Sequence, residues 1–105
     1  MSLLREKFGF EDMSAYRTKE YLLRLAGEEC SELVQAALKY IRSVEGYTNK
    51  TREECEESLT EEVADALICI DLLLDSGLVS EQVMNSVYKR KYERLTKRFK
   101  TGNYE

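Results

Sequence analysis

Two acidic groups stand out because each lies within a stretch whose apolar residues recur at helical spacing. The first is Glu28-Glu29-Cys30-Ser31-Glu32, and the second, further along the chain, is Glu61-Glu62-Val63-Ala64-Asp65. A carboxylate on the wet face of a helix is ordinary. A carboxylate within an apolar face needs a partner, because burying an uncompensated charge costs several kcal/mol. The chemistry of both groups therefore depends on what compensates their charge.

Glu29 and Asp65 are the two carboxylates that the apolar faces do not explain. On a wheel of about 100° per residue, the apolar neighbours of Glu29 fall within roughly 40° of it; they are Leu22, Leu25, Leu33, Ala36 and Tyr40. Asp65 lies in the same way among Ile68, Cys69 and Leu72. With Glu32 and Glu62 on their flanks, two antiparallel helices would bring four carboxylates into one cluster: Glu29, Glu32, Glu62 and Asp65.

Such a cluster needs cations. Two carboxylates about 4 Å apart repel by on the order of 4 kcal/mol at an effective dielectric constant of 20. The chain has no histidine, which excludes Ser-His-Asp and Cys-His catalysis and histidine-containing zinc sites. Hard oxygen ligands favour Mg²⁺ first and Mn²⁺ second, and such sites commonly take phosphate oxygens as further ligands. The pattern indicates nucleotide phosphate chemistry.

The elements that would position these residues are helices. The chain lacks proline, and its glycines punctuate it near Gly46 and Gly77. We expect a low-periodicity lead-in over residues 1–13 that docks on the helices, and a first helix from residue 14 or 18 to residue 44. A second helix would begin at Thr51 or Ser58, each followed by a capping-box glutamate, and end near residue 75. A third would run from residue 80 to about residue 99, followed by a frayed tail.

The second helix carries apolar residues on nearly every side, so three helices of one chain would hardly cover it. Residues 1–105 are therefore expected to form one all-α domain, an antiparallel helical bundle of three main helices plus the N-terminal lead-in, completed by oligomerisation. Asp71 points away from Asp65, and we expect it to make a structural or interface hydrogen bond rather than a metal contact. Gly27, in the middle of the first helix, is compatible with close approach of a neighbouring helix or ligand.

Composition excludes several other classes of protein. The net charge of −4 argues against a non-specific nucleic-acid binder. The longest apolar run is too short to span a bilayer, so no membrane association is expected. The three cysteines form no Cys-x-x-Cys pair, and no signal-like segment precedes them, which predicts reduced thiols and a cytoplasmic location.

The sequence also resembles a known family. Residues 25–33, Leu-Ala-Gly-Glu-Glu-Cys-Ser-Glu-Leu, with the helix that continues to residue 42, look like the first motif of the MazG-like all-α nucleoside triphosphate pyrophosphohydrolases. Residues 59–67, Leu-Thr-Glu-Glu-Val-Ala-Asp-Ala-Leu, look like their second motif, Glu-Glu-x-x-Asp. The resemblance covers about two thirds of the chain. It implies a homodimer or homotetramer that hydrolyses a nucleoside triphosphate to the monophosphate and pyrophosphate.

The resemblance also implies roles for individual residues. Mg²⁺ would be held by Glu29, Glu32, Glu62 and Asp65, and the attacking water would be oriented or deprotonated by Glu28 or Glu32. Phosphate charge would be stabilised by Lys39, Asn85, Lys91 and Arg94, of which the last three only approximate the third motif of the family. The alternative is a non-enzymatic helical interaction or regulatory module, whose acidic pairs form salt bridges with the basic third helix across an interface. That alternative predicts no effect of Mg²⁺ on thermal stability.

Overall fold

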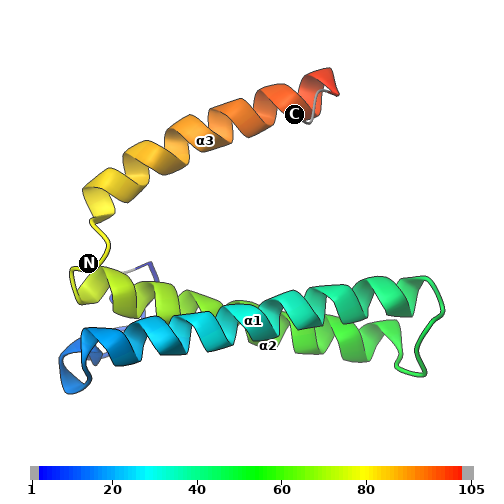
Figure 1. The fold of residues 1–105 in the computed structure, drawn as a ribbon, viewed down its shortest axis with the longest axis horizontal. Helices are drawn as coiled ribbons and strands as arrows, with labels where there is room; N and C mark the ends of the chain where they lie inside the picture. The colour runs from blue at the N-terminus through cyan, green and yellow to red at the C-terminus, as the bar shows by residue number, and fades with distance from the viewer. Residues whose placement is uncertain (1–2, 103–105) are drawn as a thin grey trace.

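The computed structural model describes residues 3–102 and shows an all-α chain (Figure 1). A single 3₁₀ turn, η1 (Ser14–Tyr16), precedes three long helices: α1 (Lys19–Val44), α2 (Arg52–Asp75) and α3 (Glu81–Thr101). Within residues 3–102 no strand is present. The predicted all-α class and the three main helices are therefore confirmed.

Side-chain caps fix where the helices begin. The hydroxyl oxygens of Thr18, Thr51 and Ser80 each accept a hydrogen bond from a backbone N–H in the first turn that follows. At Thr51 the cap is reinforced by a contact of 3.3 Å between its hydroxyl and the Glu54 carboxylate, which makes this the capping box that is used. α1 thus begins at the later of its two predicted starts, Thr18, and α2 begins at the earlier of its two, Thr51.

The C-terminal end of α3 lies slightly beyond the prediction. Thr101 still belongs to the helix, and Gly102 ends it in the left-handed conformation, with a φ of 73°. The prediction of a frayed tail is therefore wrong at residue 101. Its last part, residues 103–105, lies outside the described residues.

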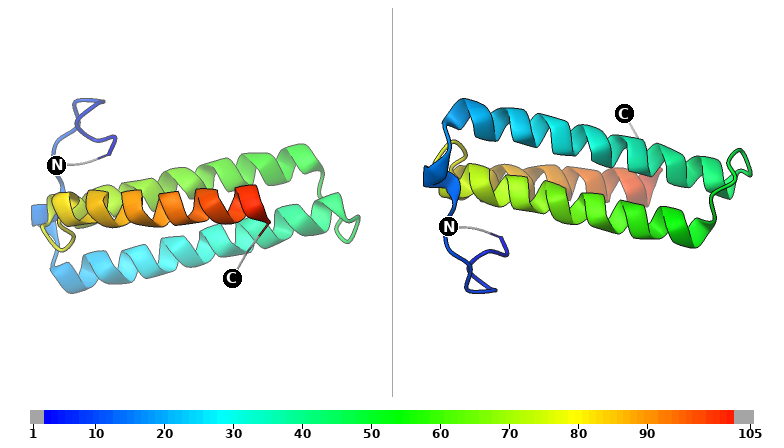
Figure 2. Two further views of the ribbon diagram at one scale, coloured as in Figure 1. Left: turned by 90° about the horizontal axis from the view of Figure 1, so that it is seen from above. Right: turned by 90° about the horizontal axis from the view of Figure 1, so that it is seen from below.

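α1 and α2 form an antiparallel pair that lies side by side along their length (Figures 1 and 2). Most of the buried apolar side chains of the described chain lie in the seam between them, and small residues such as Ala36, Ala66 and Cys69 allow close approach. The turn between the two helices includes Gly46, whose φ is 81°. This hairpin is the rigid frame that positions the acidic residues.

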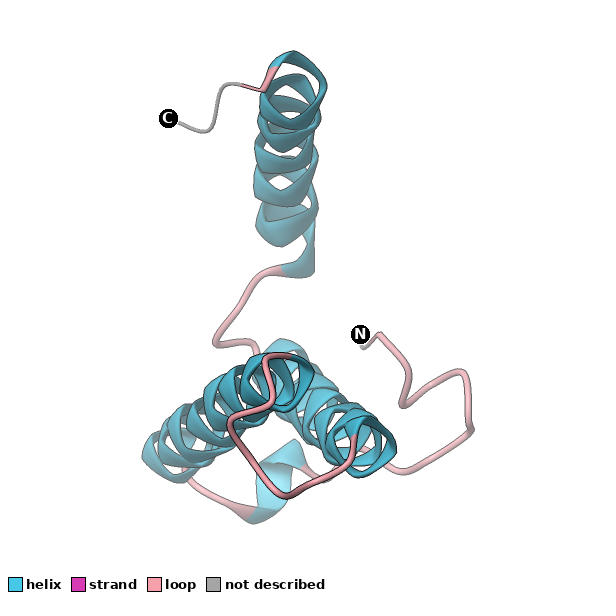
Figure 3. Cartoon of the chain, turned by 90° about the vertical axis from the view of Figure 1, so that its right-hand side faces the viewer, coloured by secondary structure: helices cyan, strands magenta, loops and turns pink. Residues whose placement is uncertain are grey.

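α3 stands apart from the hairpin (Figures 1 and 3). None of its residues is buried, although it carries exposed apolar side chains such as Val83, Tyr88 and Tyr92. Within the described part of a single chain, the three helices therefore do not close into a bundle. The expected completion by oligomerisation stays a prediction, and the free helix makes it more necessary.

The N-terminal lead-in docks on α2 through polar contacts. The backbone N–H groups of Leu3, Leu4 and Arg5 all donate to the carboxylate of Asp71, which is 7% exposed. The Arg5 guanidinium also donates to Asp75, at 2.5 Å from Nε and 3.0 Å from Nη2. The structural role predicted for Asp71 is confirmed. Phe8 and Phe10 of the lead-in are more than half exposed.

Apolar surface remains open on the hairpin itself. On α2, Val63 and Ile68 are exposed, so the single chain does not bury this helix on every side. A Cβ added at Gly27 would meet nothing within 4 Å, so no helix of the same chain approaches it. No helix within residues 3–102 is both long enough and apolar enough to cross a membrane.

Candidate metal centre

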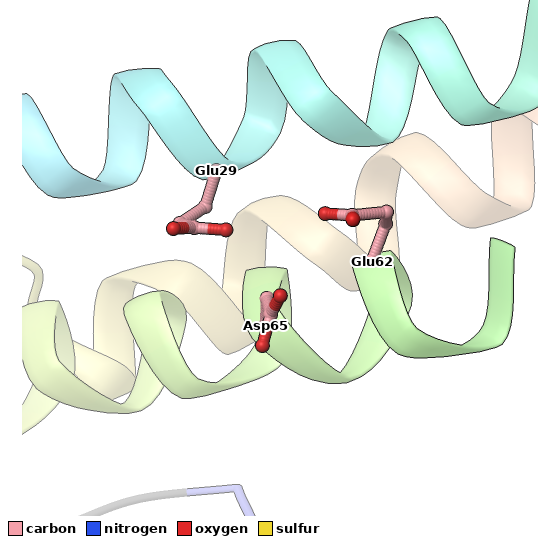
Figure 4. Close-up of side chains that lie close together, drawn as sticks. All are labelled: Glu29, Glu62 and Asp65. Carbon is pink, nitrogen blue, oxygen red and sulfur yellow. The ribbon is translucent and has the colours of Figure 1, made fainter. Parts of the chain in front are cut away.

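Three of the predicted carboxylates meet between α1 and α2. One oxygen from each of Glu29, Glu62 and Asp65 lies within 4.8 Å of the others (Figure 4). Glu29 belongs to the α1 seam that faces α2, and Glu62 belongs to the facing seam of α2, one turn before Asp65. Helical spacing on two antiparallel helices is therefore sufficient to bring these groups together.

The electrostatics of this group are unfavourable without a cation. Partial burial raises the pKa of Glu62 above its ordinary value, and the negative charges of Asp65, Glu29, Glu32 and Glu61 raise it further, in that order. The Oε2 atom of Glu62 is buried and has no hydrogen-bond partner. A carboxylate oxygen in this position lacks the compensation that buried polar atoms normally have. A cation between the helices would supply it.

Glu32, the fourth predicted ligand, lies beside this group rather than in it. It lines a hollow of about 110 Å³ between the helices, together with Glu62 and two lysines, Lys39 and Lys50. Its charge still acts on Glu62, as the raised pKa of that residue shows. The structure thus brings together three of the four predicted ligands and places the fourth in the adjoining hollow.

The hollow contains residues that helical periodicity did not indicate. Lys50 lies in the turn between α1 and α2, and Gln35 and Ser58 face the hollow from the two helices. A residue in a turn has no periodic pattern, so nothing in the sequence placed Lys50 beside the carboxylates. Lys39, which was predicted to bind phosphate, does line the hollow. The side chains of two lysines therefore line the hollow that adjoins the acidic group.

The remaining predicted residues are elsewhere. Glu28, proposed to activate water, is exposed and lines neither the carboxylate group nor the hollow as they are described. Asn85, Lys91 and Arg94 lie on α3 and are exposed. In Figure 4 the three carboxylates are seen with α3 behind the hairpin. Within one chain, the structure does not bring these α3 residues to the acidic group.

The thiol of Cys69, which lies close to the three carboxylates, is unreactive near neutral pH. Burial, and then the nearby charge of Glu29, raises the pKa of Cys69 to about 11. Near neutral pH this thiol is protonated, so it is neither a thiolate ligand nor a nucleophile. The donors that remain are carboxylate oxygens, which suit Mg²⁺ or Mn²⁺.

Comparison of the chain with models of protein families, with curated proteins and with solved structures finds no match. The MazG-like resemblance therefore rests on the motifs quoted above and stays a prediction.

Proposed function

We propose that this protein hydrolyses a nucleoside triphosphate to the monophosphate and pyrophosphate, and that Glu29, Glu62 and Asp65 hold the Mg²⁺ that this reaction uses. The observation that carries the proposal is the convergence of three carboxylate oxygens within 4.8 Å between two helices. The buried, unpartnered Oε2 of Glu62 supports it, because that atom has unused capacity to bind a cation.

The donor set fits a hard divalent ion. All three groups are carboxylates, and the adjoining thiol stays protonated near neutral pH. When bound, Mg²⁺ would neutralise phosphate charge and acidify a water for attack at phosphorus. Mn²⁺ would serve the same role, since it accepts the same ligands.

The residues of the hollow would handle the substrate and the proton. The ammonium groups of Lys39 and Lys50 would bind phosphate oxygens and offset their charge. A carboxylate oxygen of Glu32, on the same hollow, would accept a proton from the attacking water. The position of Glu32 favours it over the exposed Glu28 for this task. Asn85, Lys91 and Arg94 would contribute only if α3 reached the site from another chain of a homodimer or homotetramer.

The direct test is release of pyrophosphate. Purified protein with Mg²⁺ should release pyrophosphate from one or more members of a panel of ribo- and deoxyribonucleoside triphosphates, and EDTA should stop it. Glu62→Gln should abolish the activity while leaving the helical circular dichroism spectrum unchanged. Glu57→Gln, an exposed position one turn and a half earlier on α2, is the matched control and should keep full activity.

Two results would contradict the proposal. Full activity in Glu62→Gln would remove the metal from the mechanism. Absence of turnover with every triphosphate, together with a melting temperature that Mg²⁺ does not change, would favour a helical interaction module instead.

A further inference from the structure

α1 carries a second apolar seam next to the one that faces α2. The facing seam contains buried or half-buried residues at alternating steps of four and three: Leu22, Ala26, Glu29, Leu33, Ala36 and Tyr40. Shifting each position by one residue gives another series with the same heptad spacing: Leu23, Gly27, Cys30, Val34, Ala37, Ile41 and Val44. Leu23 is 52% exposed and Val34 is 59% exposed. Heptad spacing of apolar and small residues is the pattern of a helix-packing seam.

α2 shows the same arrangement. Its facing seam includes Cys55, Glu62, Ala66 and Cys69, and the series shifted by one residue contains Val63, Leu67 and Ile70. In an antiparallel pair, a shift of one residue turns both helices toward the same side of the hairpin. The two shifted series therefore form one surface, which we call the apolar face. Asp65 precedes its facing seam by one residue, so it borders the seam on the side away from the apolar face. We call that side, where the carboxylates of Glu29, Glu62 and Asp65 meet, the acidic face.

α3 lies over the apolar face without packing on it. The views from above and below show α3 running over the hairpin along its length (Figure 2), while Figures 1 and 3 show α3 separated from the hairpin. The right-handed winding of α1 directs residues that follow its facing seam by one position toward α3. The apolar face thus looks toward the space between the hairpin and α3, and a solvated helix of this length with no buried residue is marginal by itself.

The charges of α3 complement the hairpin. Seven of the 16 lysine and arginine residues of the chain lie on α3, whereas the hairpin is rich in glutamate and aspartate. Lys91 borders an apolar patch of α3 that is formed by Val83, Met84, Val87 and Tyr88. As an exposed charge at the edge of that patch, Lys91 can pair with a carboxylate of a surface that packs against α3. The basic residues of α3 and the acidic residues of the hairpin are therefore complementary in charge.

From these observations we propose that two copies of this chain exchange α3. In this dimer the apolar faces of the two hairpins pack against each other. The hairpin of each chain fills the space between the hairpin and the α3 of the partner chain. Each α3 therefore packs on the acidic face of the partner hairpin. Lys91 of one chain then lies beside Glu29, Glu62 and Asp65 of the other. A two-fold axis makes the contact reciprocal and closed. The catalytic consequence rests on the proposed function, since it makes Lys91 a phosphate-binding residue supplied in trans.

Mixed dimers test the exchange through activity. Glu62→Gln and Lys91→Ala chains should each be inactive alone. After mixing and reassociation, half of the dimers carry one chain of each kind; with exchange, one of their two sites holds both changes and the other holds neither. About a quarter of wild-type pyrophosphate release should return. Without exchange every site keeps one change, and activity stays at the level of the single variants.

Two controls accompany the mixing experiment. Glu62→Gln mixed with Asp65→Asn should recover nothing, because both changes lie on the hairpin and every site keeps one of them. Lys89→Ala, on the opposite side of α3 from Lys91, should keep wild-type activity. Failure of the Glu62→Gln and Lys91→Ala mixture to recover would overturn the exchange and leave the proposed function intact.

A second readout does not depend on turnover. Equal amounts of ¹⁴N- and ¹⁵N-labelled wild-type protein are mixed, reassociated and treated with a zero-length carbodiimide cross-linker. Peptides joining Lys91 to Glu29, Glu62 or Asp65 should then include pairs of mixed isotope, and Lys91→Ala should lose them. Cross-linked pairs of a single isotope only, absence of these pairs, or a monomer in sedimentation would overturn the exchange. If the wild type releases no pyrophosphate, this readout decides alone.

Discussion

Glu62 is the residue on which the site depends most. It lies beside Glu29 and Asp65, borders the hollow with Glu32, and has a buried oxygen without a partner. The pKa of its carboxyl group is raised, so the folded state prefers the neutral form. A cation reverses that preference, because it stabilises the ionised form. Metal binding and the protonation of Glu62 are therefore competing events at the same atoms.

The raised pKa predicts a pH dependence of stability in metal-free protein. A carboxyl whose folded pKa lies above its unfolded value stabilises the fold fully below the unfolded value, near 4.5, and this contribution is lost as the pH rises through the folded pKa. In EDTA, Glu62→Gln should therefore melt above the wild type near pH 7.5, and the difference should vanish at about pH 4. Thermal unfolding of both proteins across this range measures it. A wild type that melts above Glu62→Gln at neutral pH without metal would contradict the assignment.

Mg²⁺ should stabilise the wild type and not Glu62→Gln. A ligand that binds only the folded state at about 100 times its dissociation constant adds about 2.7 kcal/mol, which is several degrees in melting temperature for a chain of this size. Calorimetry with Mg²⁺, with Mn²⁺ and with EDTA compares the two proteins. Glu57→Gln should respond to Mg²⁺ as the wild type does, and an equal response of Glu62→Gln would place the ion elsewhere.

Asp71 should matter for stability rather than for the reaction. It accepts hydrogen bonds from three consecutive backbone N–H groups and is almost fully buried. Asp71→Ala leaves those donors without their acceptor and should cost about 1–3 kcal/mol in urea unfolding. Amide hydrogen exchange of residues 3–5 should accelerate at the same time. Unchanged exchange there would mean that the lead-in is held by other contacts.

At the scale of the elements, capping decides where the helices begin. The hydroxyl group of Thr51 caps α2: its oxygen accepts a hydrogen bond from the backbone N–H of Glu54, and it donates one to the Glu54 carboxylate. Thr51→Ala should lower the free energy of unfolding by about 1 kcal/mol, measured in urea, because a first-turn N–H loses its acceptor. Thr60→Ala, exposed in the middle of α2, should be close to neutral. A neutral Thr51→Ala would indicate that α2 is held by its packing alone.

The sequence was sufficient for what depends on neighbours within one helix. Periodicity brought Glu29, Glu62 and Asp65 together, and the Thr51-x-x-Glu54 pattern contained the start of α2. It was not sufficient for Lys50, because a turn residue has no periodicity to constrain its direction. The sequence also could not predict the position of α3. A stripe of apolar residues shows that a helix must pack against something, but not against which chain.

For the whole molecule, exchange of α3 would make folding and association one event. Tenfold dilution should then cost the dimer about 1.4 kcal/mol and lower its melting temperature by a few degrees. Differential scanning calorimetry over a range of protein concentrations measures this. Val34→Asp, which places a charge on the apolar face, should sediment as a monomer and lose the dependence. A wild-type melting temperature that does not vary with concentration would exclude an obligate dimer.

The contact between the lead-in and α2 has a consequence for how the protein is made. Residues 3–5 are translated well before their acceptor, Asp71, which must first become part of α2. Residues 3–5 therefore reach their final contacts only after most of the hairpin has been made. Until α2 has formed, Phe8 and Phe10 also lack the apolar hollow that they line together with Leu67, Ile68 and Leu72.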